Sequence, residues 1–179
     1  MIDFVNTVDS VGDEALTNSI IDRSITEIRD NRVTSIGISA FQSCYNLTTA
    51  DFPASTSIGS SAFQSCSKLT AAYFPAAASI GNDAFTSCRK MTKADFPAAT
   101  SIGNSAFESC AALKTLILRS GTMATLGNTN AFYETPISSG TGYIYVPAAL
   151  VDSYKAASNW STYANQIRAI ENYPEICGT

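Results

Sequence analysis

A 22-residue repeat constrains this chain of 179 residues more than any other feature. Four segments align without a gap: SIGISAFQSCYNLTTADFPA, SIGSSAFQSCSKLTAAYFPA, SIGNDAFTSCRKMTKADFPA and SIGNSAFESCAALKTLILRS. A unit of this size cannot bury its own apolar side chains, so successive copies must stack and share a core through nearest-neighbour contacts. The repeat therefore predicts a solenoid built from near-identical turns.

Five apolar columns recur in register through the four copies. They are Ile36, Ile58, Ile80 and Ile102; Phe41, Phe63, Phe85 and Phe107; Cys44, Cys66, Cys88 and Cys110; Leu47, Leu69, Met91 and Leu113; Phe52, Phe74, Phe96 and Leu118. The run Leu47 to Phe52 alternates like a strand, with Ala50 inward and Asp51 outward. Pro53 ends that strand because it cannot donate to a ladder.

Two further features of the repeat predict local geometry. The glycine column that begins at Gly37 marks a sharp corner, for which we expect a positive φ. The Ala-Phe-x-x-Cys segment predicts a short helical turn, and a side chain near its start can cap it. The candidate capping residues are Ser39, Ser60, Asn82 and Asn104.

The pattern Leu-x-x-Ala-x-Phe-Pro, followed by Ile-Gly-x-x-Ala-Phe-x-x-Cys-x-x-Leu, resembles the BspA-like leucine-rich-repeat family, in particular its gut-bacterial and phage-type members. This resemblance implies a right-handed leucine-rich-repeat solenoid of the α/β class, with a short strand and a short helical turn in each repeat. It also implies bacterial or phage-borne surface recognition, often adhesion to host proteins or cells. A cell-surface or extracellular location would follow.

The spacing predicts one single domain with four parts. They are an N-terminal cap and half-repeat (1–34), the four repeats (35–118), a degenerate repeat with an insertion and a last strand (119–147), and a C-terminal helical cap with an acidic tail (148–179). Residues 9–22 are expected to form a short covering helix. In the C-terminal cap, Leu150, Tyr154 and Ala157 have helical spacing. Such caps keep the terminal faces of a solenoid polar.

Composition excludes several classes of function. The chain has no histidine, which removes Ser-His and Cys-His nucleophile pairs and histidine zinc sites. A net charge of −4 and scattered basic residues argue against nucleic-acid binding. The N-terminus lacks a secretory signal, and no apolar run is long enough for membrane insertion, so we expect a soluble chain. We expect no metal, no cofactor and no enzymatic activity.

Two patterns in the sequence are compatible with chemistry but have simpler explanations. The four stacked cysteines could form a redox or metal-binding ladder, but a free cysteine usually behaves as a small buried apolar residue, and we favour that interpretation. Asp51 and Asp95, two turns apart, have roughly the carboxylate separation of inverting glycosidases. A flat, solvated sheet offers no desolvation to create an acid, so catalysis is disfavoured.

The outward sheet positions vary from turn to turn while the core columns stay fixed, which predicts a ligand-binding face. The candidate residues are Asp51, Tyr73, Lys93, Asp95, Ile117, Tyr143 and Tyr145. Tyrosine and isoleucine are anchors for protein or glycan ligands, although unconstrained drift and strand preference also place them there. The leading hypothesis is a non-enzymatic interaction module. The alternative is a structural spacer or assembly unit of a larger particle such as a phage component, with self-association.

Overall fold

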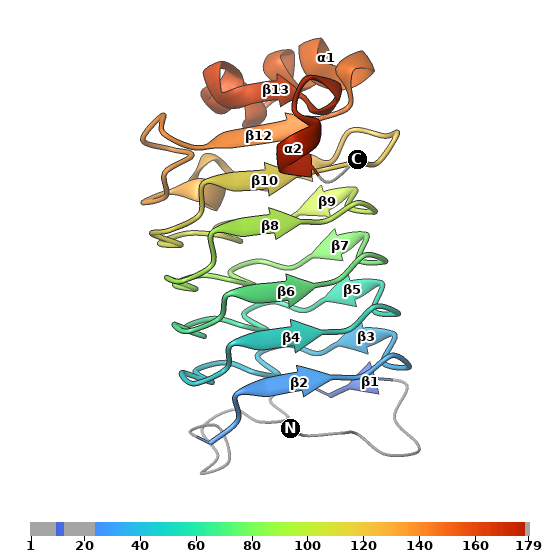
Figure 1. Cartoon of the computed structure of the whole chain (residues 1–179), viewed down its shortest axis with the longest axis vertical. Coiled ribbons are helices and arrows are strands. Elements are labelled where there is room, and N and C mark those ends of the chain that lie inside the picture. The colour runs from blue at the N-terminus through green and yellow to red at the C-terminus, as the bar shows by residue number, and fades with distance from the viewer. Residues whose placement is uncertain (1–9, 13–23, 178–179) are drawn as a thin grey trace.

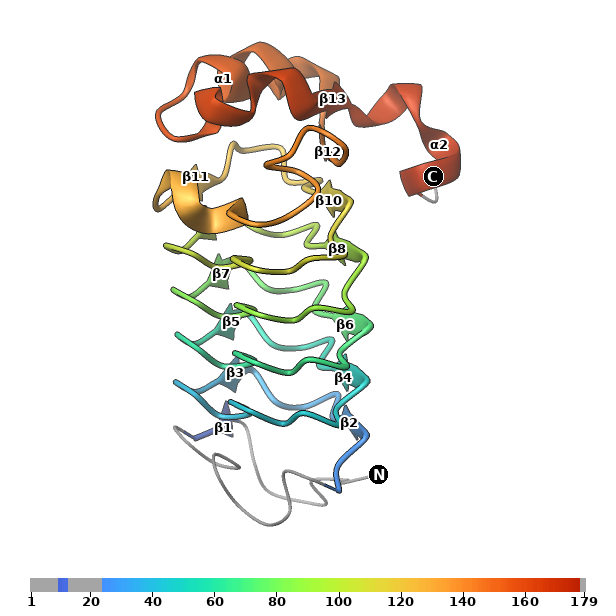
Figure 2. The same cartoon turned by 90° about the vertical axis from the view of Figure 1, so that its left-hand side faces the viewer.

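The computed structural model describes residues 10–12 and 24–177 as a stack of short parallel strands. Each turn contributes one strand to a back sheet and one to a front sheet, and the turns lie one above another along the long axis (Figures 1 and 2). The back-sheet strands are β1 (Ser10–Val11), β3 (Ser35–Ile36), β5 (Ser57–Ile58), β7 (Ser79–Ile80), β9 (Ser101–Ile102) and β11 (Thr125–Leu126). The chain thus forms the α/β repeat solenoid that the repeat predicts.

The front sheet consists of seven strands in two ladders. Its strands are β2 (Glu27–Arg29), β4 (Thr49–Asp51), β6 (Ala71–Tyr73), β8 (Lys93–Asp95), β10 (Thr115–Ile117), β12 (Tyr143–Val146) and β13 (Ile167–Ala169). One ladder has the order β2-β4-β6 and the other the order β8-β10-β12-β13. Among the described strands no pairing joins β6 to β8, whereas the back sheet continues through this level.

Strand register follows the repeat directly. Ser35 pairs with Ser57 in the back sheet, and Thr49 pairs with Ala71 in the front sheet, each one 22-residue step along the chain. In the helical turn, Gln42 N–H donates to the Ser39 carbonyl three residues earlier, which gives a single short turn of helix. Identical units therefore stack by pure translation of the register.

The core is a pair of phenylalanine stacks between the two sheets. In one stack, Phe63, Phe85 and Phe107 lie nearly parallel, with ring centroids 5.3 and 5.5 Å apart and interplanar angles of 5° and 2°. The other stack contains Phe52, Phe74 and Phe96. All the repeat columns are buried, which confirms the predicted core.

The corner glycines are required for a reason other than the expected one. Among described glycines only Gly140 has a positive φ, so the predicted left-handed corner at Gly37, and at its equivalents, is wrong. A Cβ added at Gly59 would lie 2.6 Å from the Gly37 carbonyl carbon, because the corners of successive turns touch through their backbones. The left-handed positions are instead held by residues such as Ser39 and Ser43.

Aromatic side chains of the C-terminal cap close the upper end of the core. The cap contains η3 (Ala148–Leu150), α1 (Val151–Ala156) and η4 (Trp160–Gln166), and η2 (Thr129–Phe132) precedes it in the degenerate repeat. Trp160 Nε1 donates to the Ala124 carbonyl, and the Ala124 N–H donates to the Tyr154 hydroxyl. Tyr163 packs edge-on against Phe132, the last ring of its stack. The N–H and the carbonyl of Ala124 therefore both have hydrogen-bond partners in the cap.

Two segments differ from the sequence-based expectations. In the segment expected to form a helical cap, β13 pairs with β12 and extends the front sheet. The chain then continues through η5 (Ile170–Asn172) and α2 (Pro174–Cys177). At the other end Ser10–Val11 is a strand and not helix, and the rest of the helix expected over 9–22 lies outside the described residues. Within the described ranges, no helix has the length and apolar character needed to cross a membrane.

Candidate interaction surface

The front face, meaning the outward side of β2, β4, β6, β8, β10 and β12, carries five of the seven predicted binding residues at accessible positions. Strand alternation turns the first and third residue of each strand outward. We call these five residues the exposed patch: Asp51, Tyr73, Lys93, Asp95 and Tyr143. Tyr73 is 57% exposed and Tyr143 36%, and both rings present large amphipathic surfaces. The patch spans the two front-sheet ladders.

The other two predicted residues are not exposed, so that part of the expectation is wrong. Ile117 is 0% and Tyr145 3% exposed, although both lie on the outward side of paired strands. They are covered by the C-terminal strap, residues 170–177, whose Ile170, Tyr173 and Ile176 pack on them. Figure 2 shows this segment leaving the cap and ending beside the front strands. We call Ile117 and Tyr145 the covered patch.

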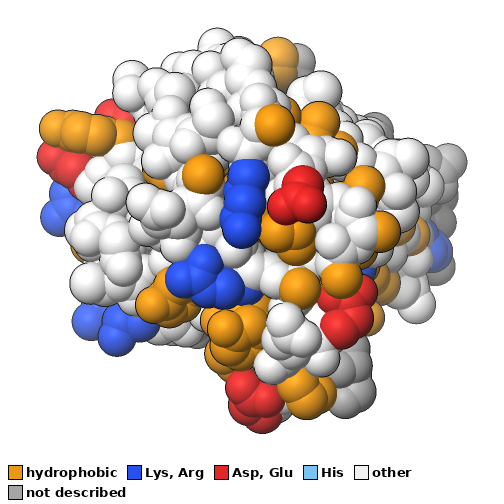
Figure 3. Space-filling model, turned by 90° about the horizontal axis from the view of Figure 1, so that it is seen from above, with side chains coloured by type: hydrophobic (Ala, Val, Ile, Leu, Met, Phe, Trp, Pro, Cys, Tyr) orange, Lys and Arg blue, Asp and Glu red, His pale blue; other side chains and the backbone are white. Residues whose placement is uncertain are grey.

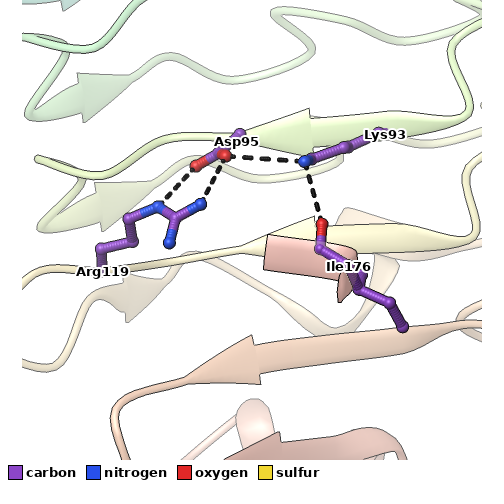
Figure 4. Close-up of polar contacts among 4 residues, drawn as sticks. All are labelled: Lys93, Asp95, Arg119 and Ile176. Atoms are coloured by element: carbon purple, nitrogen blue, oxygen red, sulfur yellow. Dashed lines mark hydrogen bonds and ion pairs between the residues drawn. The ribbon is translucent and has the colours of Figure 1, made fainter. Parts of the chain in front are cut away.

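Charged side chains along the exposed patch are paired. Arg119 reaches Asp95 through two hydrogen bonds, at 3.3 and 3.0 Å, and Lys93 Nζ lies 3.8 Å from the same carboxylate (Figure 4). Lower on the face, Arg29 donates to Asp51 at 3.1 Å. These contacts fix the orientation of both carboxylates and give the face alternating charge.

Arg119 belongs to the site, but the pattern reasoning missed it. It occupies the column that holds Pro53, Pro75 and Pro97 in the earlier repeats. The change from a recurrent proline to arginine at this position was the sequence feature that could have identified Arg119. The bidentate geometry suits a guanidinium, which offers paired N–H donors to one carboxylate.

A cation also contacts the ring of Tyr143, the upper tyrosine of the exposed patch. The Arg168 guanidinium carbon lies 4.7 Å from the centre of the Tyr143 ring, a cation–π arrangement. The same ring meets Tyr145 edge-on at 6.5 Å. These two contacts hold the Tyr143 ring in place.

The arrangement of Asp51 and Asp95 does not resemble a pair of catalytic carboxylates. Asp51 and Asp95 lie in different ladders, and each is engaged by an arginine. In the part of the chain that the structure describes, no three His, Cys, Asp or Glu side chains gather in a way that could hold a metal ion.

The cysteine ladder is part of the core. Cys44, Cys66, Cys88 and Cys110 form no disulfide bonds and are completely buried, which confirms the interpretation as small apolar residues. The Cys110 thiol donates to the Phe85 carbonyl at 3.0 Å. Burial raises the pKa of the Cys110 thiol to about 12 and the pKa values of Cys66 and Cys88 well above the ordinary value. These thiols stay protonated and therefore unreactive at neutral pH.

The stacked parallel strands, the 22-residue register and the mainly apolar interior define a leucine-rich-repeat solenoid. The BspA type leucine rich repeat region matches residues 1–92 and 78–147, with six copies, and the chain belongs to this family. Repeats of this kind serve in general as interaction modules. A search of curated proteins found no match to this chain.

Two solved structures share the fold. A leucine-rich repeat protein from Bacteroides ovatus superposes with a TM-score of 0.65 at 20% sequence identity, over 87% of this chain and 38% of that one. A leucine rich cell surface protein from Faecalibacterium prausnitzii gives a TM-score of 0.53 at 23% identity, over 76% of this chain and 42% of that one. This chain thus spans about two-fifths of the length of either protein.

Proposed function

We propose that this chain is a non-enzymatic interaction module that binds a protein or glycan ligand through the exposed patch of its front sheet. The observation that carries the proposal is the exposure of Tyr73 and Tyr143 on a face whose core-side residues are nearly invariant between repeats. Amphipathic rings of this kind supply contact area at a small entropic cost. The cell-surface description of the Faecalibacterium relative supports a role in surface recognition or adhesion.

The polar residues of the exposed patch would give the interaction its specificity. Lys93 is an exposed cation beside the Asp95 carboxylate, and Asp51 lies near the opposite end of the patch. Such rim charges set orientation and association rate more than affinity. The ligand would therefore contact Asp51 at one end of the patch and Tyr143 at the other, with Tyr73, Lys93 and Asp95 between them.

The test is a binding screen of the whole chain against glycan arrays, matrix proteins and intact bacterial and animal cells. The double variant Tyr73→Ser and Tyr143→Ser is expected to lose at least 10-fold in affinity for any ligand found. The matched control replaces Tyr45 and Tyr133, which are 50% and 54% exposed but lie outside the front strands. Tyr145 is left unchanged because it is buried.

Two outcomes would contradict the proposal. Equal loss in the control variant would show that exposed tyrosines in general, and not the front face, carry binding. A chain that binds nothing but forms a defined oligomer in light scattering would favour the alternative, a structural spacer or assembly unit of a larger particle.

A further inference from the structure

The covered patch is an apolar site on the side of the sheet that normally faces solvent. Ile117 and Tyr145 pair directly across β10 and β12. Among the described residues they form an apolar cluster with Ile170, Tyr173 and Ile176, separate from the main core. The strap supplies these three apolar partners, and Tyr143 also contacts the Tyr145 ring. Removing the strap would therefore increase the exposure of an isoleucine and a tyrosine that lie side by side.

The strap occupies this patch in the manner of a bound peptide. The Tyr173 ring meets the Tyr145 ring edge-on, with centroids 5.2 Å apart. At the far end of the strap, Lys93 Nζ donates to the Ile176 carbonyl at 3.1 Å (Figure 4). The strap thus offers an aromatic side chain, an aliphatic side chain three residues later, and a main-chain carbonyl held by a lysine. These are the elements of peptide recognition.

Charge complements the apolar contact. The strap carries Glu171 and Glu175, and the Glu171 carboxylate accepts the Ala148 N–H at 3.0 and 3.1 Å. The surrounding front face carries two cations, Lys93 and Arg119, and one carboxylate, Asp95, which leaves it with a net positive charge. A segment that combines apolar side chains with acidic neighbours therefore suits this position, whereas a basic segment would face like charges.

The contacts that hold the strap on the covered patch are partly exposed to solvent. Tyr173 and Ile176 are only partly buried, and the Lys93 side chain is 45% exposed. The helix α2 has four residues, too few for a helix to be stable by itself. Within the part of the chain that the structure describes, no strand pairing holds the backbone beyond Ala169. Release of the strap would therefore break side-chain packing and hydrogen bonds such as that from Lys93 to Ile176, and it would leave the main core intact.

We propose that the covered patch is a binding site for an acidic, apolar peptide segment of a partner protein, and that the strap is an internal ligand which this partner displaces. The partner segment presents an aromatic and a branched aliphatic side chain three residues apart, with a carbonyl directed at Lys93. This inference rests on the proposed function, because the exposed patch and the covered patch both lie on the front face. It adds that the strap controls whether a ligand can reach the covered patch. When the strap occupies the covered patch, it lowers the apparent affinity for the partner. The apparent affinity is then the intrinsic affinity multiplied by the fraction of molecules in which the strap is released.

The test uses the strap itself as the probe. A fluorescent peptide with the sequence of residues 170–179, in which serine replaces Cys177, is titrated into the whole chain and followed by anisotropy. The receptor variant Tyr173→Ser with Ile176→Ser releases the strap and is expected to bind the peptide at least 10-fold more tightly than the parent chain. That ratio corresponds to a strap that is closed in about 90% of parent molecules or more. A peptide carrying the same two serines is the matched control and should not bind.

Site variants in the released background locate the bound peptide. Tyr145→Ser is expected to abolish binding, and Tyr133→Ser, which changes an exposed tyrosine outside the front strands, is expected to leave it unchanged. If Tyr145→Ser fails to fold, Lys93→Gln provides the same test at an exposed residue, with an expected loss of about threefold or more from the charge-assisted hydrogen bond.

Three results would overturn the inference. They are equal affinity of the parent and released chains, no binding to a released chain with a normal melting curve, and an unchanged affinity for the peptide after the change at Tyr145 or Lys93. Lys93 belongs to the exposed patch as well, but ligand binding by that patch is judged by Tyr73 and Tyr143, which none of these variants changes. Failure of the strap proposal and failure of the interaction-module proposal are therefore distinguishable.

Discussion

Replacing Phe85 with alanine tests the stacked core most directly. Phe85 is fully buried, with Phe63 and Phe107 stacked on its two faces at 5.3 and 5.5 Å. Phe74 and Phe96 lie beside it at 6.2 and 5.8 Å. A buried Phe-to-Ala change costs about 3–5 kcal/mol, and aromatic pairs contribute about 0.5–1.5 kcal/mol beyond their burial. Since hydrogen-bonded turns above and below hold the neighbouring rings apart, the cavity collapses poorly, and we expect a loss of about 4–5 kcal/mol.

Urea unfolding followed by circular dichroism measures this loss. With a slope of about 2–3 kcal/mol/M, the transition midpoint should fall by about 1.3–2.5 M. The control is Tyr73→Ala, which changes an exposed ring on the front face and should cost less than about 1 kcal/mol. Similar losses at Phe85 and Tyr73 would refute the assignment of inward and outward faces. A loss under about 2 kcal/mol at Phe85 would show instead that neighbouring turns close the gap.

Two further predictions concern the corners and the buried thiols. Gly81→Ala places a Cβ 2.5 Å from Ser60 N and should cost about 2–3 kcal/mol, whereas Gly121→Ala has nothing within 4 Å and should stay within about 1 kcal/mol; equal melting temperatures would contradict the close approach of the corners. Burial raises the pKa of Cys110 from 9.0 to about 12, so from about pH 9 to 12 the folded chain keeps a proton that the unfolded chain loses. Stability should therefore fall with rising pH in this window by about 1.4 kcal/mol per unit for this thiol, and a flat urea midpoint above pH 9 would reject it.

The fold could be predicted because one pattern specifies both the local structure and the contacts. Columns that advance by 22 residues fix strand register, as in the pairing of Ser35 with Ser57. They also place each phenylalanine on its equivalent in the next turn. Gly59 was found at the right place for the wrong reason, since sequence shows that a side chain is excluded but not whether φ or a neighbouring backbone excludes it.

The candidate site was predicted less completely, because it depends on segments outside the repeat. Strand alternation correctly assigned Tyr73 to the exposed face, and it assigned Ile117 to the same face. The covering of Ile117 comes from residues 170–177, which have neither the 22-residue spacing nor strand alternation. A nonperiodic segment gives no sign of where it will dock. The missing pairing between β6 and β8 likewise has no counterpart in the residue pattern.

The uniform 22-residue register makes the length of the array independent of its ends. Loss of one whole unit, such as residues 57–78, would bring Phe85 against Phe41 and Cys88 against Cys44, pairs of the same kind as those already present. Gain of a whole unit would preserve the same pairs in the same way. Each event would change the front face by one strand spacing, about 4.8 Å, and leave both caps as they are. The solenoid can therefore change its length in steps of one turn without a change in the kind of contacts that hold it together.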